Sequence, residues 1–311
     1  MRNFKIKFSF FILSVFSLGT ISMAQECKTD TFKLVKIQSH YTFSARINNG
    51  AAGTFLLESG IHVMLIDSLF AFNNLPSLNL DFIRNDKNEK MNLGGKVYTI
   101  THKAKGKIHI NDHTLYEGEI FVLPGYKSTY EIAIPIQKLY NHSDKKNSII
   151  KLDLTNENLY VLNRKEFKKE EHDYSKVKMN FSNYLNMPAI KTKLRIAEGD
   201  KIRTLSGNFN LDLGNASFVF LFQQNKAVQS FLKTNSDLKL QKAYNKKGML
   251  IAEATVVKEC ELCNLKFENS IIAITKALPR FTTEGSIGLK FFEKATVIFD
   301  FTQSNFYLKD K

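Results

Sequence analysis

The sequence predicts an all-β protein with a few short helices, built as two related β lobes. Two observations carry this prediction: strand-like runs dominate the chain, and similar elements recur in the same order in its two halves. The runs are short and apolar or alternating, with turn residues between them, and include "YTFSARI", "GTFLLE", "KVYTITHKAKGKIHI", "LYEGEIFVL", "AIKTKLRI", "FVFLF", "MLIAEATVV" and "ATVIFDF". Helical patterns are scarce, and the clearest is "NKAVQSFLK" at Asn225–Lys233.

The chain begins with a segment typical of export. A basic start precedes a mostly apolar run at Phe8–Leu18, and small residues follow up to Ala24. We therefore expect residues 1–24 to be a signal peptide that is removed. A retained membrane anchor is the alternative, but the apolar run is short for crossing a bilayer. The expected location is periplasmic or extracellular, with no membrane span after removal.

Size and charge limit the classes of partner. Removing 24 of the 311 residues leaves 287, which suits one large domain or two lobes. The formal net charge of +14 then falls to +11, because three basic residues and no acid lie in the removed segment. The lysines are spread along the chain, without a basic block interleaved with aromatic residues. This pattern indicates a solvated surface, and we expect no nucleic-acid partner.

The cysteines and histidines do not indicate a metal site or a cofactor. Besides Cys27, the chain has "CELC" at Cys260–Cys263, which we expect at a hairpin turn. A local disulfide between Cys260 and Cys263 and a pair of free thiols both stay open. A zinc site would need further ligands, and His109 and His113 are four residues apart in a turn. No phosphate-binding loop or dinucleotide fingerprint is present.

The two halves share a series of elements. Each half has an apolar run that ends in a carboxylate, one further residue and a glycine: "GTFLLESG" at 53–60 and "GNFNLDLG" at 207–214. Later come "EIAIPIQKLY" and "SIIKLDLTNENLYVL" in the first half, and "GSIGLKFFEK" and "ATVIFDFTQSNFYLK" in the second. We expect a first lobe at 25–162 and a second at 181–311. The intervening segment, 163–180, is a charge run and is expected to be a solvated connector.

With these motifs the chain resembles the pepsin and retropepsin superfamily of aspartic proteases, in a secreted bacterial branch. The resemblance covers most of residues 40–311. In that family each lobe carries Asp-Thr/Ser-Gly in a loop after an apolar strand, and closes with an Ile-Gly-Leu-like stretch, as "GSIGLKFF" does at Gly285–Phe292. The resemblance implies two pepsin/retropepsin-like β lobes related by a pseudo-two-fold axis.

The resemblance also implies a pair of catalytic carboxyl groups, with Glu58 and Asp212 as the candidates. Two carboxylates about 3 Å apart cannot both ionise, so they share one proton. The ionised group activates a water molecule, and the protonated group polarises the scissile carbonyl. The neighbouring residues would support the two acid loops; they are Ser59, Gly60, Leu213 and Gly214.

Both acid loops depart from the family pattern. Glu58 replaces an aspartate, and its extra methylene moves the carboxyl group by roughly 1.5 Å, a displacement that can cost about a hundredfold in rate. Leu213 replaces a residue with a hydroxyl group, so one side of the bracing hydrogen bonds is expected to be lost. The first lobe also has Ile134 and Pro135 where the family places a glycine and its neighbour.

Two functional interpretations therefore stay open. In the first, the protein is a pseudoenzyme with weak or lost peptidase activity, and its cleft binds a peptide or protein ligand. In the second, it is an active aspartic endopeptidase that uses Glu58 and Asp212. Neither needs a metal or another cofactor. The segment "NLGGKVYTI", with Gly94 and Gly95 at its bend, is a candidate flap over the cleft, although an ordinary hairpin fits equally well.

Overall fold

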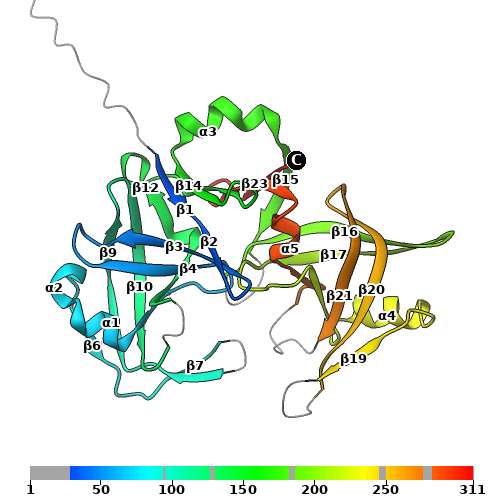
Figure 1. The fold of residues 1–311 in the computed structure, drawn as a ribbon, viewed down its shortest axis with the longest axis horizontal. Helices are drawn as coiled ribbons and strands as arrows, with labels where there is room; N and C mark the ends of the chain where they lie inside the picture. Colours follow the sequence, from blue (N-terminus) through cyan, green and yellow to red (C-terminus); the bar gives the residue numbers. More distant parts are fainter. Residues whose placement is uncertain are drawn as a thin grey trace, which may run out of the picture.

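The computed structural model describes residues 29–93, 96–126, 130–181, 186–244, 250–275 and 282–310. Strands dominate this part of the chain and form two lobes side by side; most of the short helices lie on the outside, and α5 (Leu289–Phe292) lies near the middle (Figure 1). The all-β prediction is confirmed. The expected signal peptide, Cys27, Gly94 and Gly95 lie outside the described residues.

The first lobe is built on a sheet with the strand order β2–β3–β4–β11–β5–β10–β9–β6, and β12 pairs with β10. The strands are β2 (Val35–Ile37), β3 (His40–Arg46), β4 (Ala52–Glu58), β5 (Met64–Asp67), β6 (Ile83–Arg84), β9 (His102–Ile110), β10 (Thr114–Leu123), β11 (Ile132–Pro135) and β12 (Leu139–Asn141). A separate hairpin consists of β7 (Lys90–Leu93) and β8 (Lys96–Thr99). The helices are α1 (Ser68–Asn73), α2 (Leu75–Leu78) and the 3-10 turns η1 (Ile136–Lys138) and η2 (His142–Asp144).

The second lobe continues a longer sheet from β15 (Ser175–Asn180) in the order β16–β17–β22–β18–β21–β20–β19. Its strands are β16 (Ala189–Glu198), β17 (Lys201–Leu211), β18 (Val219–Phe222), β19 (Gln241–Tyr244), β20 (Leu250–Leu262), β21 (Leu265–Thr275) and β22 (Gly285–Ile287). Helix α4 (Lys226–Thr234) begins at Asn225, whose side chain accepts hydrogen bonds from the first-turn amides, and α5 (Leu289–Phe292) follows β22.

The two lobes repeat one strand arrangement around the acid loops. In the first lobe β11 lies between β4 and β5, parallel to β4 and antiparallel to β5. In the second lobe β22 lies between β17 and β18 with the same directions. Ile134 therefore pairs with Leu57, just before Glu58, as Ile287 pairs with Leu211, just before Asp212. This shared register gives the residue correspondence between the lobes.

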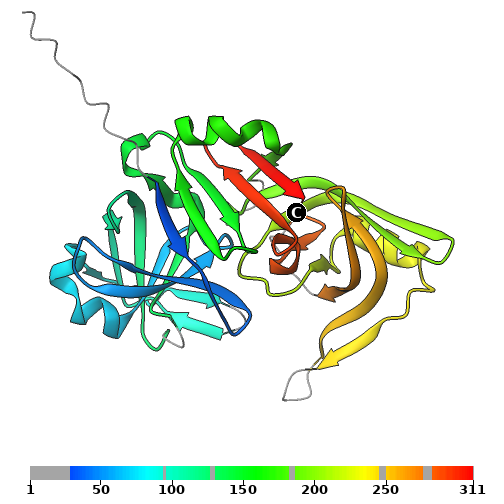
Figure 2. The same cartoon turned by 45° about the horizontal axis from the view of Figure 1, so that its top comes forward.

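A joining sheet connects the lobes in the order β1–β14–β13–β23–β24–β15 (Figure 2). Its strands are β1 (Asp30–Lys33), β13 (Ile149–Asp153), β14 (Asn158–Leu162), β15 (Ser175–Asn180), β23 (Ala295–Asp300) and β24 (Asn305–Asp310). Two matching hairpins meet where β13 pairs with β23. In one turn Asp153 Oδ1 accepts from Asn156 N at 3.2 Å, and in the other Asp300 Oδ1 accepts from Gln303 N at 3.0 Å.

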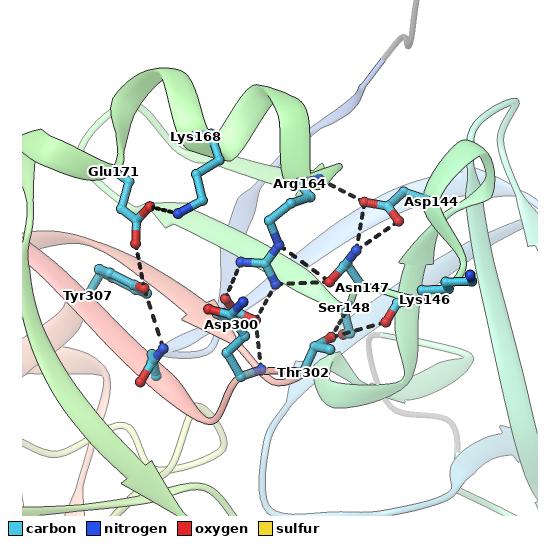
Figure 3. Close-up of polar contacts among 12 residues, drawn as sticks. Asp144, Lys146, Asn147, Ser148, Arg164, Lys168, Glu171, Asp300, Thr302 and Tyr307 are labelled. Atoms are coloured by element: carbon cyan, nitrogen blue, oxygen red, sulfur yellow. Dashed lines mark hydrogen bonds and ion pairs between the residues drawn. The ribbon is translucent and has the colours of Figure 1, made fainter.

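The segment 163–180 is regular along most of its length. Helix α3 (Arg164–Glu170) and the 3-10 turn η3 (Glu171–Asp173) precede β15. Phe167 anchors α3 in a buried cluster over the joining sheet, and Arg164 forms a two-pronged ion pair with the fully buried Asp300 (Figure 3). The charge run thus covers one face of the joining sheet. The exact lobe boundaries stay a prediction.

Candidate active site

Glu58 and Asp212 lie at the carboxyl ends of equivalent strands in the two lobes, β4 and β17. Glu58 is the last residue of β4, and Asp212 directly follows β17, where its backbone N–H donates to Ile287 O at 2.9 Å. The side chains of both line one cleft of about 430 Å³ between the lobes. The fold therefore brings together the two carboxyl groups that the sequence singled out, although their catalytic role stays a prediction.

The glycines after each acid allow the two carboxyl groups to approach the opposite loop. A methyl group built on Gly60 would lie 3.5 Å from Asp212 Oδ1. The equivalent methyl on Gly214 would lie only 2.5 Å from Glu58 Oε2. The difference of 1.0 Å between these two distances shows that Glu58 reaches further into the opposite loop than Asp212 does, as its additional methylene predicts.

Ser59 braces the second acid loop with its side chain. Its buried Oγ donates to Leu211 O at 2.8 Å and accepts from Leu213 N at 2.8 Å, so it bonds to the backbone on both sides of Asp212. Leu213 is the equivalent residue of the second lobe, and its apolar side chain is buried in the core. It has no hydroxyl group with which to form the reciprocal pair of hydrogen bonds.

The environment of Asp212 favours the carboxylate more than that of Glu58 does. Burial keeps the pKa of Asp212 above its ordinary value, against the lowering effect of hydrogen bonds from Ser286, Gly214 N and Asn215 N and of the charge of His40. Ser286 Oγ donates to Oδ2 and Gly214 N donates to Oδ1, both at 3.1 Å.

Burial and the neighbouring charge of Asp212 raise the pKa of Glu58 to about 8, against the lowering effect of the Gly60 N–H. The two acids are therefore expected to share one proton near neutral pH.

Most of the other residues that line the cleft are apolar or aromatic. Asn92, Leu93 and Tyr98 of the β7–β8 hairpin line it together with the two acids, as expected for a flap. The ring of Tyr126 packs edge-on against Tyr98 and Tyr130, with centroids 5.6 Å apart in each pair. Whether the hairpin gates the cleft stays a prediction.

Two polar residues of the site were not found from the sequence. His40 begins β3, and its Nε2 lies 3.0 Å from Gly214 O. Ser286 precedes the Ile-Gly-Leu-like stretch. The sequence did offer a signal for Ser286, namely its position just before the Ile-Gly-Leu-like stretch. The strand at this position, β22, pairs with β17, and Asp212 directly follows β17. No local pattern marks His40, whose contact with the second lobe spans 174 residues.

The possible disulfide does not form in this structure, where Cys260 and Cys263 are free thiols. Cys260 is buried in β20, whereas Cys263 lies in the two-residue turn after it with a φ of +55°. Its Sγ lies 3.4 Å from Thr192 Oγ1. The two thiols have different neighbours, Ser270 for Cys260 and Thr192 for Cys263. Burial raises the pKa of each thiol to about 11.

Within the described residues, no group of three or more His, Cys, Asp or Glu side chains is placed to hold a metal ion. His109 packs its ring against His142 at 5.1 Å, apart from the cleft. Of the helices described, none is long and apolar enough to cross a membrane.

Comparison with known proteins supports the fold class. No protein-family model matches the sequence, and no curated protein matches it. Among solved structures, the aspartic proteinase from Irpex lacteus is similar over 91% of this chain and 98% of its own, with a TM-score of 0.54 and 8% identity. At that identity the likeness shows the fold alone: a pepsin-like, two-lobed aspartic proteinase fold. The bacterial branch stays a prediction.

Proposed function

We propose that this protein is an exported, aspartic-protease-like protein whose cleft binds an extended peptide or protein segment, with peptide-bond hydrolysis slow or absent. The observation that carries the proposal is the reach of Glu58 into the opposite loop. Glu58 Oε2 lies 2.5 Å from the position of a methyl group built on Gly214. Asp212 Oδ1 lies 3.5 Å from the position of the equivalent methyl group on Gly60. The longer side chain therefore places its carboxyl group differently from that of an aspartate, and misplacement of a reacting group by about 1 Å can reduce a rate about a hundredfold.

The cleft keeps features that suit peptide binding. Leu93 and Tyr98 present side chains from the hairpin, and Phe220 and Met187 line the cleft from the second half of the chain. Apolar walls with a few polar groups at the centre are typical of ligand sites. An extended peptide would also find main-chain hydrogen-bond partners along strand edges. None of these features depends on the position of the Glu58 carboxyl group.

A peptide library separates binding from cleavage. The chain from residue 25 is incubated with mixed peptides from about pH 3 to 8, and retained peptides and cleavage products are identified by mass spectrometry. We expect retained peptides and little or no cleavage. The matched variant, Glu58→Asp with Leu213→Thr, should gain cleavage because it restores both altered groups. Failure to retain any peptide would contradict the binding role.

A second candidate function is an active aspartic endopeptidase. The observation in its favour is that the Ser59 brace persists, and that burial raises the pKa of both acids while Asp212 receives more hydrogen bonds than Glu58 does. Asp212 would take a proton from water as the water oxygen attacks the carbonyl carbon, and Glu58 would donate its proton to the carbonyl oxygen. Ordinary turnover by the unmodified chain, abolished by Asp212→Asn, would select this function.

Export is part of the proposal and has its own test. The basic and apolar start of the sequence supports it. Expression of the full chain in a bacterial host, followed by N-terminal sequencing of the exported fraction, should give a chain that begins at Gln25. Recovery of the uncut chain in the membrane fraction would instead indicate a retained anchor.

A further inference from the structure

Ser286 breaks the symmetry of the acid pair. It lies on β22 opposite Asn210, two residues before Asp212, and its buried Oγ donates to Asp212 Oδ2 at 3.1 Å. In the first lobe, Ala133 lies on β11 opposite Leu56, two residues before Glu58. The shared register makes Ala133 the counterpart of Ser286. Its methyl group cannot donate, so this strand position supplies a hydrogen bond to one acid only.

Each acid also accepts a hydrogen bond from the glycine two residues further on. Asp212 accepts from the N–H of Gly214, two residues on, and Glu58 accepts from the N–H of Gly60 in the same way. Asp212 also receives a hydrogen bond from the N–H of Asn215, and the hydroxyl group of Ser286 is the added side-chain donor on the Asp212 side. A hydrogen bond to a charged acceptor is stronger than one between neutral groups, so it favours the ionised carboxylate.

We propose that Ser286 is a positioning residue that fixes the single negative charge of the acid pair on Asp212 and leaves the shared proton on Glu58. The inference rests on the proposed function in that it takes this cleft as the ligand site. It specifies how a ligand would be oriented there. A ligand carbonyl would face the Glu58 acid as donor, and a ligand N–H, a hydroxyl group or a water molecule would face the Asp212 carboxylate as acceptor.

The other titratable groups around the cleft agree with this assignment. Among the described residues, those that line it besides the pair are His40 from β3, Tyr98 from β8, and Tyr126 and Tyr130 from the segment after β10. The charge of His40 favours the ionised form of Asp212. Burial raises the pKa of Tyr126 far above its usual range, so this ring adds no negative charge near Glu58 at neutral pH.

The proposal is tested by carboxyl NMR on the chain from residue 25, with labelled Asp and Glu, from about pH 3 to 10 and without peptide. Asp212→Asn and Glu58→Gln assign the two signals. In the unmodified chain the Asp212 signal should titrate first, and the Glu58 signal should titrate close to its expected pKa of about 8. Ser286→Ala should raise the lower apparent pKa by about one unit, whereas Ser286→Thr should leave it in place.

The reciprocal variant, Ala133→Ser, supplies a hydroxyl group on the other side and should lower the pKa of Glu58 by about one unit. It keeps the test decisive if Ser286→Ala fails to fold. The proposal is overturned if Glu58 titrates first in the unmodified chain, or if folded Ser286→Ala titrates unchanged. It is also overturned if Ala133→Ser does not shift Glu58. Because no peptide is present, these outcomes are independent of whether the cleft binds or cleaves peptides.

Discussion

Gly214 is the residue at which the reach of the Glu58 side chain can be tested by mutation. In Gly214→Ala the new methyl group would lie 2.5 Å from Glu58 Oε2 and 2.9 Å from its Cδ, so the glutamate must move. We expect a loss of about 1–3 kcal/mol in the free energy of unfolding, measured with urea. Gly60→Ala is the matched control and should cost less, because its methyl would meet Met187 Cε at 3.4 Å.

Gly214→Ala in a Glu58→Asp background tests whether contact with the Glu58 side chain causes the loss of stability. The shorter side chain leaves room for the methyl group, so Gly214→Ala should then cost clearly less. An equal loss in both backgrounds would show that Glu58 is not the source of the strain.

The proton on Glu58 makes stability depend on pH. Its pKa rises from 4.5 in the ordinary state to about 8 in the folded chain, so the folded state holds more protons between these values. The free energy of unfolding should therefore fall as pH rises from 4.5 to 8, by up to about 1.4 kcal/mol per pH unit from this group. Urea unfolding of the unmodified chain and of Glu58→Gln measures the difference. If the difference in free energy of unfolding between the two proteins did not change with pH over this interval, the burial of an acid pair would be contradicted.

At the residue scale, sequence reasoning found the groups that local patterns mark. Glu58 and Asp212 each end an apolar run before a glycine, and that pattern is readable in one dimension. Ser286 and His40 were missed because they reach the site through strand pairing and a contact between lobes. Neither kind of proximity follows from spacing in the sequence.

Among the elements, helix α3 is held by the buried Phe167 and by an ion pair between Arg164 and the buried Asp300. Arg164 bonds to both carboxylate oxygens of Asp300, at 2.9 Å for the Nη2–Oδ1 contact, and Asn147 Oδ1 accepts from the same guanidinium (Figure 3). Arg164→Met would leave the buried carboxylate of Asp300 without its cationic partner, and we expect a loss of about 3–5 kcal/mol in unfolding free energy.

Lys168→Met is the matched control on the same helix. Lys168 pairs with Glu171 and is largely exposed, so its loss should cost less than about 1 kcal/mol. Calorimetry of both variants checks the prediction. Similar losses in the two variants would show that the Arg164 pair contributes no more than a surface ion pair.

The sequence predicted the elements to different degrees. Most strands follow from apolar runs, and the equivalence of β11 and β22 follows from their place in the order of elements. Helix α3 was expected to be a connector because its sequence, "RKEFKKE", has a single apolar residue. Phe167 and the Arg164–Asp300 pair fix it to the joining sheet, and both contacts involve residues distant in the sequence.

In the whole molecule, the joining sheet should make the two lobes unfold together. β13 of the first half pairs with β23 of the second over Ile149–Leu152, and one buried cluster includes Phe55, Phe209 and Phe299. Separating the halves would expose an apolar strand edge and part of this core, which is costly in water. We therefore expect a single unfolding transition by calorimetry, with hydrogen exchange in β4 and β17 lost at the same denaturant concentration.

The isolated first half, residues 25–162, provides the complementary test. Without β23, the edge of β13 has no partner, and exposed strand edges promote pairing with other chains. We expect this fragment to be unfolded or self-associated by analytical ultracentrifugation, whereas addition of the second half should restore a monomeric complex. A stable monomeric fragment with the hydrogen-exchange protection of the full chain would contradict this dependence. In that case each lobe would be an independent folding unit, and the cleft between them would be free to open as the lobes rotate.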